Sequence, residues 1–545
     1  MIILSLMCIV SSVYCDSVSV STNQGTLIGR KNKTENGVEY NEFLQIPFAK
    51  PPVGNLRFKS PQPPESWEGE RDAREADENH ICTQSDIITQ RTKGSEDCLY
   101  LNVFSPISAS KTNSKPVIVF IHGGGYIFGN GILKNENNPT YLLENDVIVV
   151  FINYRLGVFG FLSLDIPEAA GNMGLKDQLM ALKWVQENIE HFGGDKDNVT
   201  IMGLSAGSAS VEYHILSPVS KGLFSKAIMQ SGSALNHWAI NHNIKNLSMT
   251  LVRELGYKAS EDNDRAIYQF ILNTNAIDLL TASIKVTDPR NFNGLFFGFV
   301  PSIEKDFGTG ETFLSEYPYN LLKEGRFQKV PIIRGFCEFE GYIMLTGSYC
   351  KKINLVINKN FTSVWEYKLH PEDAVNYNEK FNNVYYNDVE SNKEQTALDF
   401  FGDFEMKSGI LKSSKIMSTK GVNIYVYQFA YDGNINFLKK LFNINRKGAA
   451  HADDAAYIFG LGDQSLKNAS HDDIITLKRM TKMWTNFAKS GNPTATANDL
   501  LPVKWPEYDL HEEKYLEINS YLEVRTAYEP EKMAIFDAIY EKYHT

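Results

Sequence analysis

A serine between two glycines is the first feature of this sequence that could do covalent chemistry. The motif G-L-S-A-G at 203–207 follows a short apolar run, Val199–Met202, and precedes a stretch with helical spacing. A sharp turn from a strand into a helix exposes the middle residue of such a motif in a strained conformation, and glycines are needed where no Cβ fits. The context therefore predicts that Ser205 is a nucleophile, and it argues against an ordinary Gly/Ser turn.

A nucleophilic serine also needs backbone donors that stabilise the oxyanion formed during acyl transfer. The segment H-G-G-G-Y at 122–126 follows the apolar run Val117–Ile121 and leaves its N–H groups unshielded by side chains. Glycines at 123, 125 and 129 also resemble the G-x-G-x-x-G loop of dinucleotide-binding proteins. The last of them comes one residue too late for that loop, so we favour an oxyanion site.

The base that accepts the serine proton must be one of eleven histidines. In the chain order that accompanies this serine motif, the acid and then the histidine follow the serine. His451 satisfies this order and lies in a loop of small residues, G-A-A-H-A-D-D at 448–454, after the alternating segment Val422–Phe429. His451 is therefore the predicted base. Asp453 and Asp454 stand at a predicted helix start, where acids favour the helix dipole, and we expect them to be structural.

The acid that orients the base is expected between the serine and the histidine, after a strand. The run Val330–Gly335 has the composition of such a strand, and Glu338 and Glu340 both follow it. Periodicity does not choose between these two residues.

Strands and helices must alternate for these residues to meet. Val117–Ile121 and Val147–Ile152 are continuous apolar runs, which are typical of strands covered on both faces. Leu175–His191 has apolar residues at helical spacing, and Val199–Met202 predicts the next strand. Strand, helix and strand in this order predict an α/β class with a mostly parallel sheet covered by helices on both faces. The absence of repeats and linkers predicts one large domain over 16–545.

Composition places the chain among soluble globular proteins. Hydrophobic residues make up 43%, charged residues 22%, and the net charge is −11, which argues against nucleic acid as the main partner. Residues 1–15 form a short apolar stretch without charge, which predicts a signal peptide cut before Asp16. No later stretch contains 18 consecutive apolar residues, so no membrane span is predicted and we expect a secreted protein.

Cysteines and glycosylation sequons fit an extracellular destination. Cys8 and Cys15 would leave with the signal peptide, and the local pairing of the other four is Cys82 with Cys98 and Cys337 with Cys350. Glycosylation is predicted at four Asn-x-Ser/Thr sites, namely Asn32, Asn246, Asn360 and Asn468. A fifth, Asn198, directly precedes a predicted strand, and we expect it to be buried and unmodified.

Two further segments carry a resemblance to a known family. The sequences I-P-F-A-K-P-P-V-G-N-L-R-F at 46–58 and E-D-C-L-Y-L-N-V at 96–103, together with the serine motif, resemble the type-B carboxylesterase and cholinesterase family of α/β-hydrolases, most closely an insect-type carboxylesterase. The resemblance covers nearly the whole mature chain and implies the α/β-hydrolase fold.

The resemblance implies roles for individual residues. It favours Glu340 as the acid because the family's acid stands directly before a glycine, as Glu340 does before Gly341. It assigns the oxyanion hole to the backbone N–H groups of Gly124, Gly125 and Ala206. The remaining implied features are a first disulfide, two ion pairs and a serine near the acid: Cys82–Cys98, Arg57–Glu96, Arg155–Asp177 and Ser231.

Three departures from the family pattern bear on substrate preference and covalent structure. Leu204 stands where the family usually has Glu beside the nucleophile. Cys337 and Cys350 match no family disulfide. The segment 82–98 contains no Trp, whereas cholinesterases carry their choline-binding Trp there, and it contains Arg91 and Lys93. These features predict that choline esters are poor substrates.

The predicted function is a secreted serine carboxylesterase that hydrolyses neutral carboxylic esters through an acyl-enzyme intermediate, with a small-molecule ester as partner and without a cofactor or metal. Segments at 57–58, 177–178 and 448–454 also resemble juvenile hormone esterases, although those usually have Gln where Leu204 stands. Adhesion proteins of the cholinesterase-like group generally lose a triad member, and this chain keeps all three. Adhesion is therefore the least favoured alternative.

Overall fold

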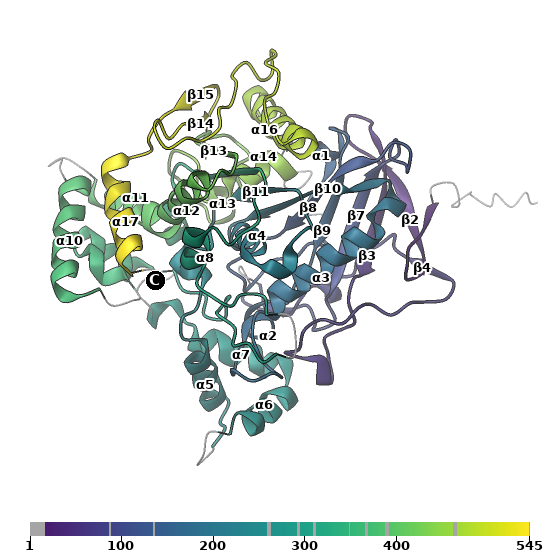
Figure 1. The fold of residues 1–545 in the computed structure, drawn as a ribbon, viewed down its shortest axis with the longest axis horizontal. Helices are drawn as coiled ribbons and strands as arrows, with labels where there is room; N and C mark the ends of the chain where they lie inside the picture. Colours follow the sequence, from purple (N-terminus) through teal and green to yellow (C-terminus); the bar gives the residue numbers. More distant parts are fainter. Residues whose placement is uncertain are drawn as a thin grey trace, which may run out of the picture.

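A computed structural model describes most of the chain (Figure 1). The described residues are 17–86, 89–133, 137–258, 263–291, 295–308, 312–347, 349–365, 369–386, 392–460 and 466–543. The predicted signal peptide, with its two cysteines, lies outside these ranges.

One large sheet runs through the molecule, with 13 strands in the described part of the chain. Its order is β1-β2-β3-β7-β9-β8-β10-β11-β12-β13-β14-β15, with β4 beside β2. Its strands are β1 Ser17–Ser21, β2 Thr26–Lys33, β3 Glu39–Pro47, β4 Glu70–Asp72, β7 Tyr100–Pro106, β8 Lys115–Ile121, β9 Ile148–Ile152, β10 Gly194–Leu204, β11 Lys226–Gln230, β12 Ile332–Cys337, β13 Ile424–Phe429, β14 Tyr515–Ile518 and β15 Leu522–Arg525. A separate ribbon pairs β5 Gln84–Ser85 with β6 Thr92–Lys93.

The centre of the sheet is parallel and its margins are antiparallel, except that β4 pairs with β2 in parallel. Neighbouring strands from β9 through β8, β10, β11, β12 and β13 to β14 run in the same direction. The pairs β1/β2, β2/β3, β3/β7, β7/β9 and β14/β15 are antiparallel. The predicted mostly parallel sheet is confirmed. Parallel neighbours align their carboxyl ends at one edge, where α/β proteins place their sites.

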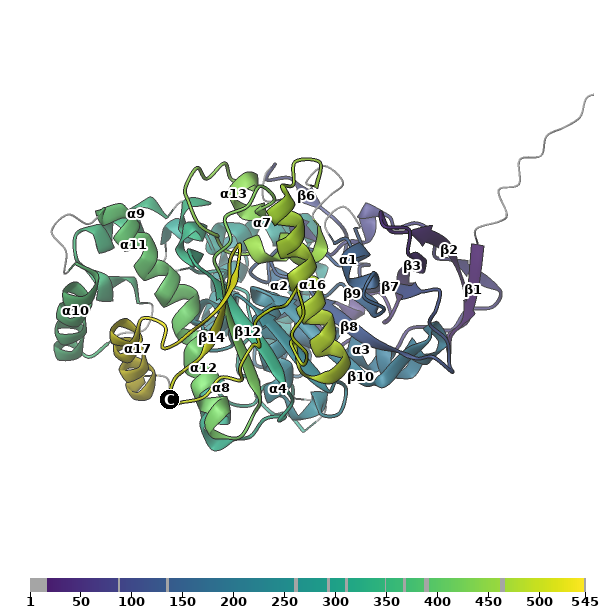
Figure 2. The same ribbon diagram turned by 90° about the horizontal axis from the view of Figure 1, so that it is seen from above.

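Helices cover both faces of the sheet (Figure 2). They are α1 Thr140–Leu143, α2 Gly157–Phe161, α3 Met173–Asn188, α4 Ala206–Leu216, α5 Ile244–Glu254, α6 Asp264–Asn273, α7 Ala276–Val286, α8 Pro318–Glu324, α9 Cys350–Ile357, α10 Pro371–Tyr385, α11 Lys393–Gly402, α12 Ser408–Thr419, α13 Phe437–Leu441, α14 Ala456–Phe459, α16 His471–Ser490 and α17 Pro530–Tyr543. A π-helical turn, Asp403–Lys407, joins α11 to α12.

The alternating side chains of β8 explain why two layers of helices are needed. Val119 belongs to the same buried core as Leu182 of α3, whereas the next residue, Phe120, belongs to a second core with Trp484 of α16. Phe120 also packs against Phe459 of α14, with ring centroids 4.5 Å apart. Because both faces of the strand are apolar, each face must be shielded from water.

Most predicted elements have the expected type, with shifted ends. The predicted helix Leu175–His191 is α3, which continues as a 3-10 turn, Ile189–Phe192. The strand before Ser205 begins at Gly194, so Asn198 lies within β10 and does not precede it. Asn198 is half-buried, and its side-chain oxygen accepts a hydrogen bond from the Lys226 ammonium. The expectation of a buried Asn198 is therefore only partly met.

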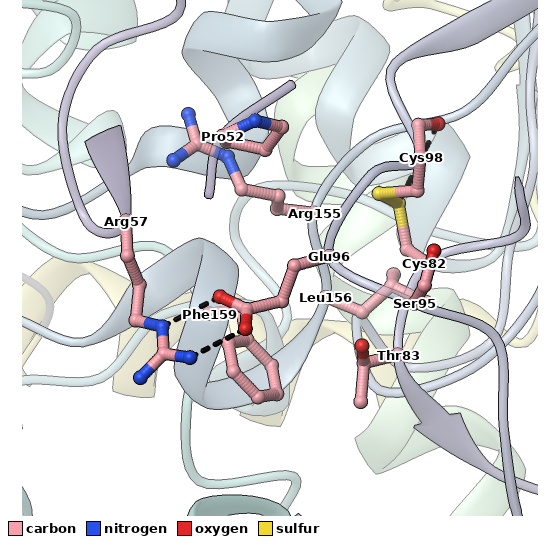
Figure 3. Close-up of a pocket in the computed structure, with 10 residues that line it drawn as sticks. All are labelled: Pro52, Arg57, Cys82, Thr83, Ser95, Glu96, Cys98, Arg155, Leu156 and Phe159. Carbon is pink, nitrogen blue, oxygen red and sulfur yellow. Dashed lines mark hydrogen bonds and ion pairs between the residues drawn. A yellow bond between two sulfur atoms is a disulfide. The ribbon is translucent and has the colours of Figure 1, made fainter. Parts of the chain in front are cut away.

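A disulfide and an ion pair connect segments within the first hundred residues of the chain (Figure 3). Cys82 and Cys98 form a disulfide, as the resemblance implies, whereas Cys337 and Cys350 are unpaired. The local pairing expected for that second pair is wrong, because Cys337 ends the buried strand β12 and Cys350 is exposed at the start of α9.

Arg57 connects three parts of the structure. Its guanidinium binds both carboxylate oxygens of Glu96. The same group donates to the carbonyl oxygens of Leu272 at 3.0 Å and Thr274 at 2.7 Å, at the C-terminal end of α6. A positive side chain there satisfies carbonyl groups that the helix leaves without partners. The second implied ion pair, Arg155–Asp177, is also present and buried.

Candidate active site

Ser205 occupies the turn between β10 and α4. Its φ of 56° and ψ of −119° lie outside the regions that L residues usually adopt. A Cβ on Gly203 would clash with the carbonyl of Gly207, and a Cβ on Gly207 would clash with the carbonyl of Ile121 in β8. The Ser205 N–H donates to the carbonyl oxygen of Gln230 at 2.8 Å, which fixes the turn to β11. The two glycines are thus required by the close approach of backbone.

The structure brings Ser205, His451 and Glu340 together. His451 Nε2 lies 3.0 Å from Ser205 Oγ, and His451 Nδ1 lies 2.6 Å from Glu340 Oε2. Glu340 is fully buried and His451 is 4% exposed. An imidazole held between a hydroxyl and a carboxylate can accept the hydroxyl proton while the carboxylate balances the new positive charge.

Several groups keep the Glu340 carboxyl ionised. Burial favours the neutral form, but nearby His451, the Ser231 hydroxyl and the Cys337 N–H outweigh burial and hold the pKa of Glu340 below its ordinary value. The Cys337 N–H donates to Glu340 Oε1 at 2.7 Å, so the two carboxylate oxygens face different partners. This arrangement leaves Oε2 for the imidazole.

Glu338, the other acid left open by periodicity, does not contact the histidine. It is half-buried, and burial raises the pKa of Glu338, while the positive charge of Lys407 lowers it. Its N–H donates to Phe429 of β13, and the N–H of the next residue, Phe339, donates to Ala449 at 2.8 Å. The chain then turns, and this turn directs Glu340 toward His451.

The glycine loop after β8 lies against Ser205. A Cβ on Gly123 would stand 3.2 Å from Ser205 Cβ. Gly124 and Gly125 have φ values of 103° and 59°, which glycine adopts without strain. Within the described residues, the N–H groups of Gly124, Gly125 and Ala206 donate no hydrogen bond. Ala206 is also the first residue of α4, so its N–H lies at the positive end of the helix dipole.

His122 supports this loop. Its ring stacks on Tyr154 with centroids 4.4 Å apart, and its Nδ1 lies 2.8 Å from the carbonyl oxygen of Gly123. Burial lowers the pKa of His122 to about 4, so the ring is neutral at physiological pH. The described residues 122–133 contain turns and no helix, so the dinucleotide-loop alternative is wrong.

Asp453 and Asp454 do start a helix, as predicted, in a 3-10 turn that leads into α14. Both are buried, however, and their carboxylates bind neighbouring loops, which sequence reasoning missed. Asp453 accepts from the N–H groups of Ala450 at 2.7 Å and Leu438 at 2.9 Å. Asp454 accepts from Tyr427 at 2.6 Å and from the Gln230 side chain at 2.8 Å. They hold the elements on either side of His451.

Two cavities lie near the glycine loop: the first touches its continuation at Ile127 and Phe128, and the second adjoins the first at Phe296. One, of about 200 Å³, is lined by Phe128 and Phe297 among others, and a second, of about 710 Å³, by Trp238 and others. The Phe297 ring packs where a Cβ of Gly125 would stand and meets Trp238 edge-on at 5.8 Å. Phe296 lines both cavities. The aromatic run F-F-G-F at 296–299 is the signal by which sequence could have found these walls.

Neither a metal cluster nor a membrane span is found in the part of the chain that the structure describes. No group of three or more His, Cys, Asp or Glu side chains there could hold a metal ion. No described helix combines the length and apolar character needed to cross a bilayer.

The fold and the Ser–His–Glu geometry define the class as an α/β-hydrolase with a serine nucleophile motif. Residues 16–536 match the model of the carboxylesterase family. The chain therefore belongs to the carboxylesterase family, and it is a carboxylic ester hydrolase of the serine type.

The chain is similar to several individual esterases. The chain is 36% identical over 512 residues to a juvenile hormone esterase of Tribolium castaneum, covering 88% of this chain and 84% of the relative. It is 33% identical over 522 residues to esterase E4 of Myzus persicae, covering 91% and 90%. The crystal structure of juvenile hormone esterase from Manduca sexta, with OTFP covalently attached, superposes with a TM-score of 0.85 at 29% identity, covering 96% of this chain and 100% of that chain.

Proposed function

We propose that Ser205 attacks the carbonyl carbon of a carboxylic ester and that His451 accepts the hydroxyl proton and returns it to the leaving alcohol. Glu340 orients the imidazole, and the N–H groups of Gly124, Gly125 and Ala206 stabilise the oxyanion. Water then repeats the cycle on the acyl-enzyme. The observation that carries this proposal is the chain of contacts from Ser205 Oγ through His451 to the buried Glu340 carboxylate.

We further propose that the substrates are neutral esters with an apolar group. Aromatic rings line much of the two cavities, and apolar Leu204 stands beside the nucleophile. Asp86, on the wall of the smaller cavity, is paired with Lys93 at 3.2 Å, which leaves little net charge there. Burial of apolar substrate surface against such walls would supply binding free energy of about 25 cal/mol per Å².

A panel of esters tests this proposal. kcat/KM is measured for p-nitrophenyl acetate, butyrate and octanoate, for butyrylcholine and for juvenile hormone. The proposal requires turnover of neutral esters that is abolished by a serine-directed phosphonate. Absence of turnover of every ester in the panel, by protein that is folded, would contradict it.

Juvenile hormone is the second candidate substrate. The support is 36% identity to a juvenile hormone esterase and the volume of the larger cavity, about 710 Å³, which could hold a long apolar acyl chain. This candidate requires juvenile hormone to exceed p-nitrophenyl butyrate in kcat/KM. A higher kcat/KM for p-nitrophenyl butyrate than for juvenile hormone would favour a general carboxylesterase instead.

We also propose secretion after removal of residues 1–15, with glycans on Asn32, Asn246, Asn360 and Asn468. Asn246, Asn360 and Asn468 are exposed and Asn32 is half-buried, so the first three are accessible to the modifying enzyme. N-terminal sequencing of protein from the medium of insect cells should begin at Asp16. Retention of the uncleaved chain inside the cell would contradict secretion.

A further inference from the structure

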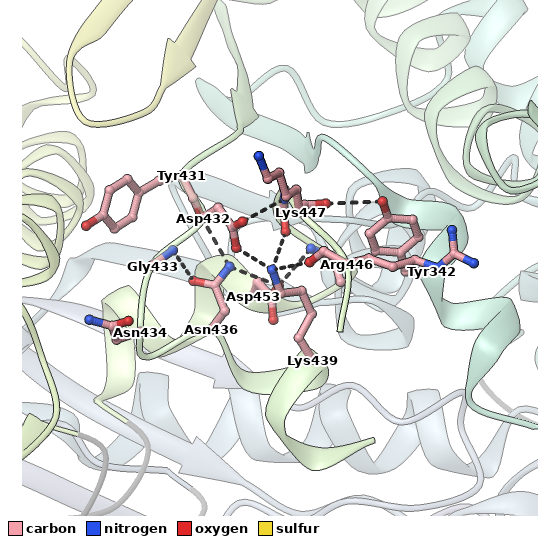
Figure 4. Close-up of polar contacts among 12 residues, drawn as sticks. Tyr342, Tyr431, Asp432, Gly433, Asn434, Asn436, Lys439, Arg446, Lys447 and Asp453 are labelled. Carbon is pink, nitrogen blue, oxygen red and sulfur yellow. Dashed lines mark hydrogen bonds and ion pairs between the residues drawn. The ribbon is translucent and has the colours of Figure 1, made fainter. Parts of the chain in front are cut away.

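The segment that carries His451 is held by a lysine that sequence reasoning did not single out. Lys439, on the short helix α13, directs its ammonium back toward the chain between α13 and the histidine (Figure 4). It donates to the carbonyl oxygens of Arg446 at 2.9 Å and Gly448 at 2.8 Å, and it pairs with Asp432. The ammonium thus has acceptors for all three of its protons.

Asp432 completes the arrangement at Gly448. Its second carboxylate oxygen accepts from the Gly448 N–H at 2.9 Å, while Lys439 holds the carbonyl of the same residue. Gly448 has a φ of 88°, and a Cβ there would clash with the ring of Phe339. The peptide groups on both sides of this glycine are therefore fixed by side chains of opposite charge.

The fixed glycine leads directly to the base. The residue after Gly448, Ala449, accepts the N–H of Phe339, and Phe339 and Ala450 pair as a parallel bridge. His451 follows Ala450, and Glu340 follows Phe339. Any shift at Gly448 is consequently passed within three residues to the 2.6 Å contact between Glu340 and His451.

We propose that Lys439 and Asp432 are positioning residues, which set the alignment of His451 between Ser205 and Glu340 without touching substrate. This inference rests on the role proposed for His451. A displacement of about 1 Å in a catalytic group can cost on the order of a hundredfold in rate. Loss of the ammonium should therefore lower kcat and leave KM nearly unchanged, because the cavities are lined by other elements.

The test compares Lys439→Met, Lys439→Arg and Lys440→Met. Lys440 is the exposed neighbour on the same helix and serves as the matched control. The concentration of reactive active sites is determined by titration with a phosphonate until the reaction is complete. For p-nitrophenyl butyrate, kcat is then calculated per titrated site, and KM is measured in the same assay. We expect Lys439→Met to lower kcat by ten- to a hundredfold with KM within twofold. Lys439→Arg should recover most of that loss, and Lys440→Met should match wild type.

Two outcomes would overturn the inference. In one, Lys439→Met keeps kcat per titrated site within twofold of wild type. In the other, only the number of titratable sites falls, which would mean that Lys439 serves folding alone. If Lys439→Met does not fold, Asp432→Asn gives the answer, because Asp432 is exposed and the variant keeps one acceptor oxygen; it should lower kcat at least threefold. Failure of wild type to hydrolyse any ester would instead contradict the proposed function.

Discussion

Phe339 and Ala449 are joined by a backbone hydrogen bond of 2.8 Å between two loops that are distant in the sequence. One loop leads from β12 to Glu340, and the other leads from α13 to His451. Main-chain pairing therefore aligns the acid and the base of the candidate triad, in addition to the direct contact between their side chains. Ser205 is fixed separately, through its N–H to Gln230 of β11.

Replacement of Ser205 by Ala should abolish ester hydrolysis without unfolding the protein. The substitution removes only the Oγ atom that faces His451 Nε2, and loss of a triad member typically lowers kcat by about 10⁴- to 10⁶-fold. Steady-state kinetics and a thermal melt of the same preparation check this prediction. A variant that retains a tenth of wild-type activity would show that another residue is the nucleophile.

Glu340→Gln and Glu338→Gln should differ strongly, although the two residues are neighbours in sequence. The first removes the negative charge 2.6 Å from His451 Nδ1, whereas Glu338 makes no contact with the imidazole. We expect Glu340→Gln to lower kcat by about 10³-fold or more and Glu338→Gln by less than threefold. Equal losses of kcat in the two variants would mean that both residues act through the conformation of the loop, and that the contact between Glu340 and His451 is not decisive.

Stability should depend on pH through Asp453. Burial raises the pKa of Asp453 from 3.8 to about 7, although several hydrogen bonds oppose the shift. Since the folded chain then binds an extra proton between about pH 4 and 7, this group's contribution to the free energy of unfolding is complete below pH 4. It falls by a few kcal/mol as pH rises to 7.

Asp453→Asn removes that proton linkage and loses an acceptor for a backbone N–H. The variant should melt below wild type at pH 5, and the difference in Tm should narrow at pH 8, where wild type has lost its contribution. Differential scanning calorimetry at both pH values measures the two differences. A difference that stays constant or widens with pH would show that Asp453 is ionised throughout.

Neutral esters should be better substrates than choline esters. A quaternary ammonium group is best held over an aromatic face, with Trp preferred, and the segment 82–98 provides none. The repulsion expected there comes mainly from exposed Arg91, because Lys93 is neutralised by Asp86. We expect p-nitrophenyl butyrate to exceed butyrylcholine at least tenfold in kcat/KM.

Leu204→Glu is the matched variant for this comparison, since it places a negative charge beside the nucleophile. The ratio of butyrylcholine to neutral-ester turnover should rise in this variant. Phenylalanine faces near the site, such as those of Phe128 and Phe297, are the alternative cation site. If wild type prefers butyrylcholine, these rings must supply the binding that the segment 82–98 lacks.

Sequence patterns predicted the central strands well because continuous apolar runs such as Val117–Ile121 have few other stable arrangements. They also singled out Ser205 and His451 as candidates, because close backbone packing requires small residues on either side of each. They could not choose between Glu338 and Glu340, because the choice depends on the turn after Phe339. The resemblance chose the residue that the structure places against His451.

Contacts formed only when distant loops meet were beyond sequence reasoning. Nothing in the sequence distinguishes Lys439 and Asp432 from ordinary surface charges, because their contacts depend on how the backbone of residues 446–448 folds. Cys337 and Cys350 are close in sequence, yet one is buried at the end of β12 and the other is exposed, so proximity misled the pairing. The aromatic run at 296–299 marks part of the cavity walls in the sequence, but the way α5 and α7 join it to complete them could not be predicted.

The carbonyl contacts of Arg57 bear on how this enzyme can acquire new specificities. Arg57 anchors the end of α6 to Glu96, and the cavity walls on α7 and 296–300 begin only after that anchor. Duplicated genes could therefore diverge in the walls while inheriting the anchor unchanged. Directed-evolution libraries that randomise the walls and spare Arg57, Glu96 and residues 271–274 should yield a higher share of soluble clones than libraries spread evenly over the chain.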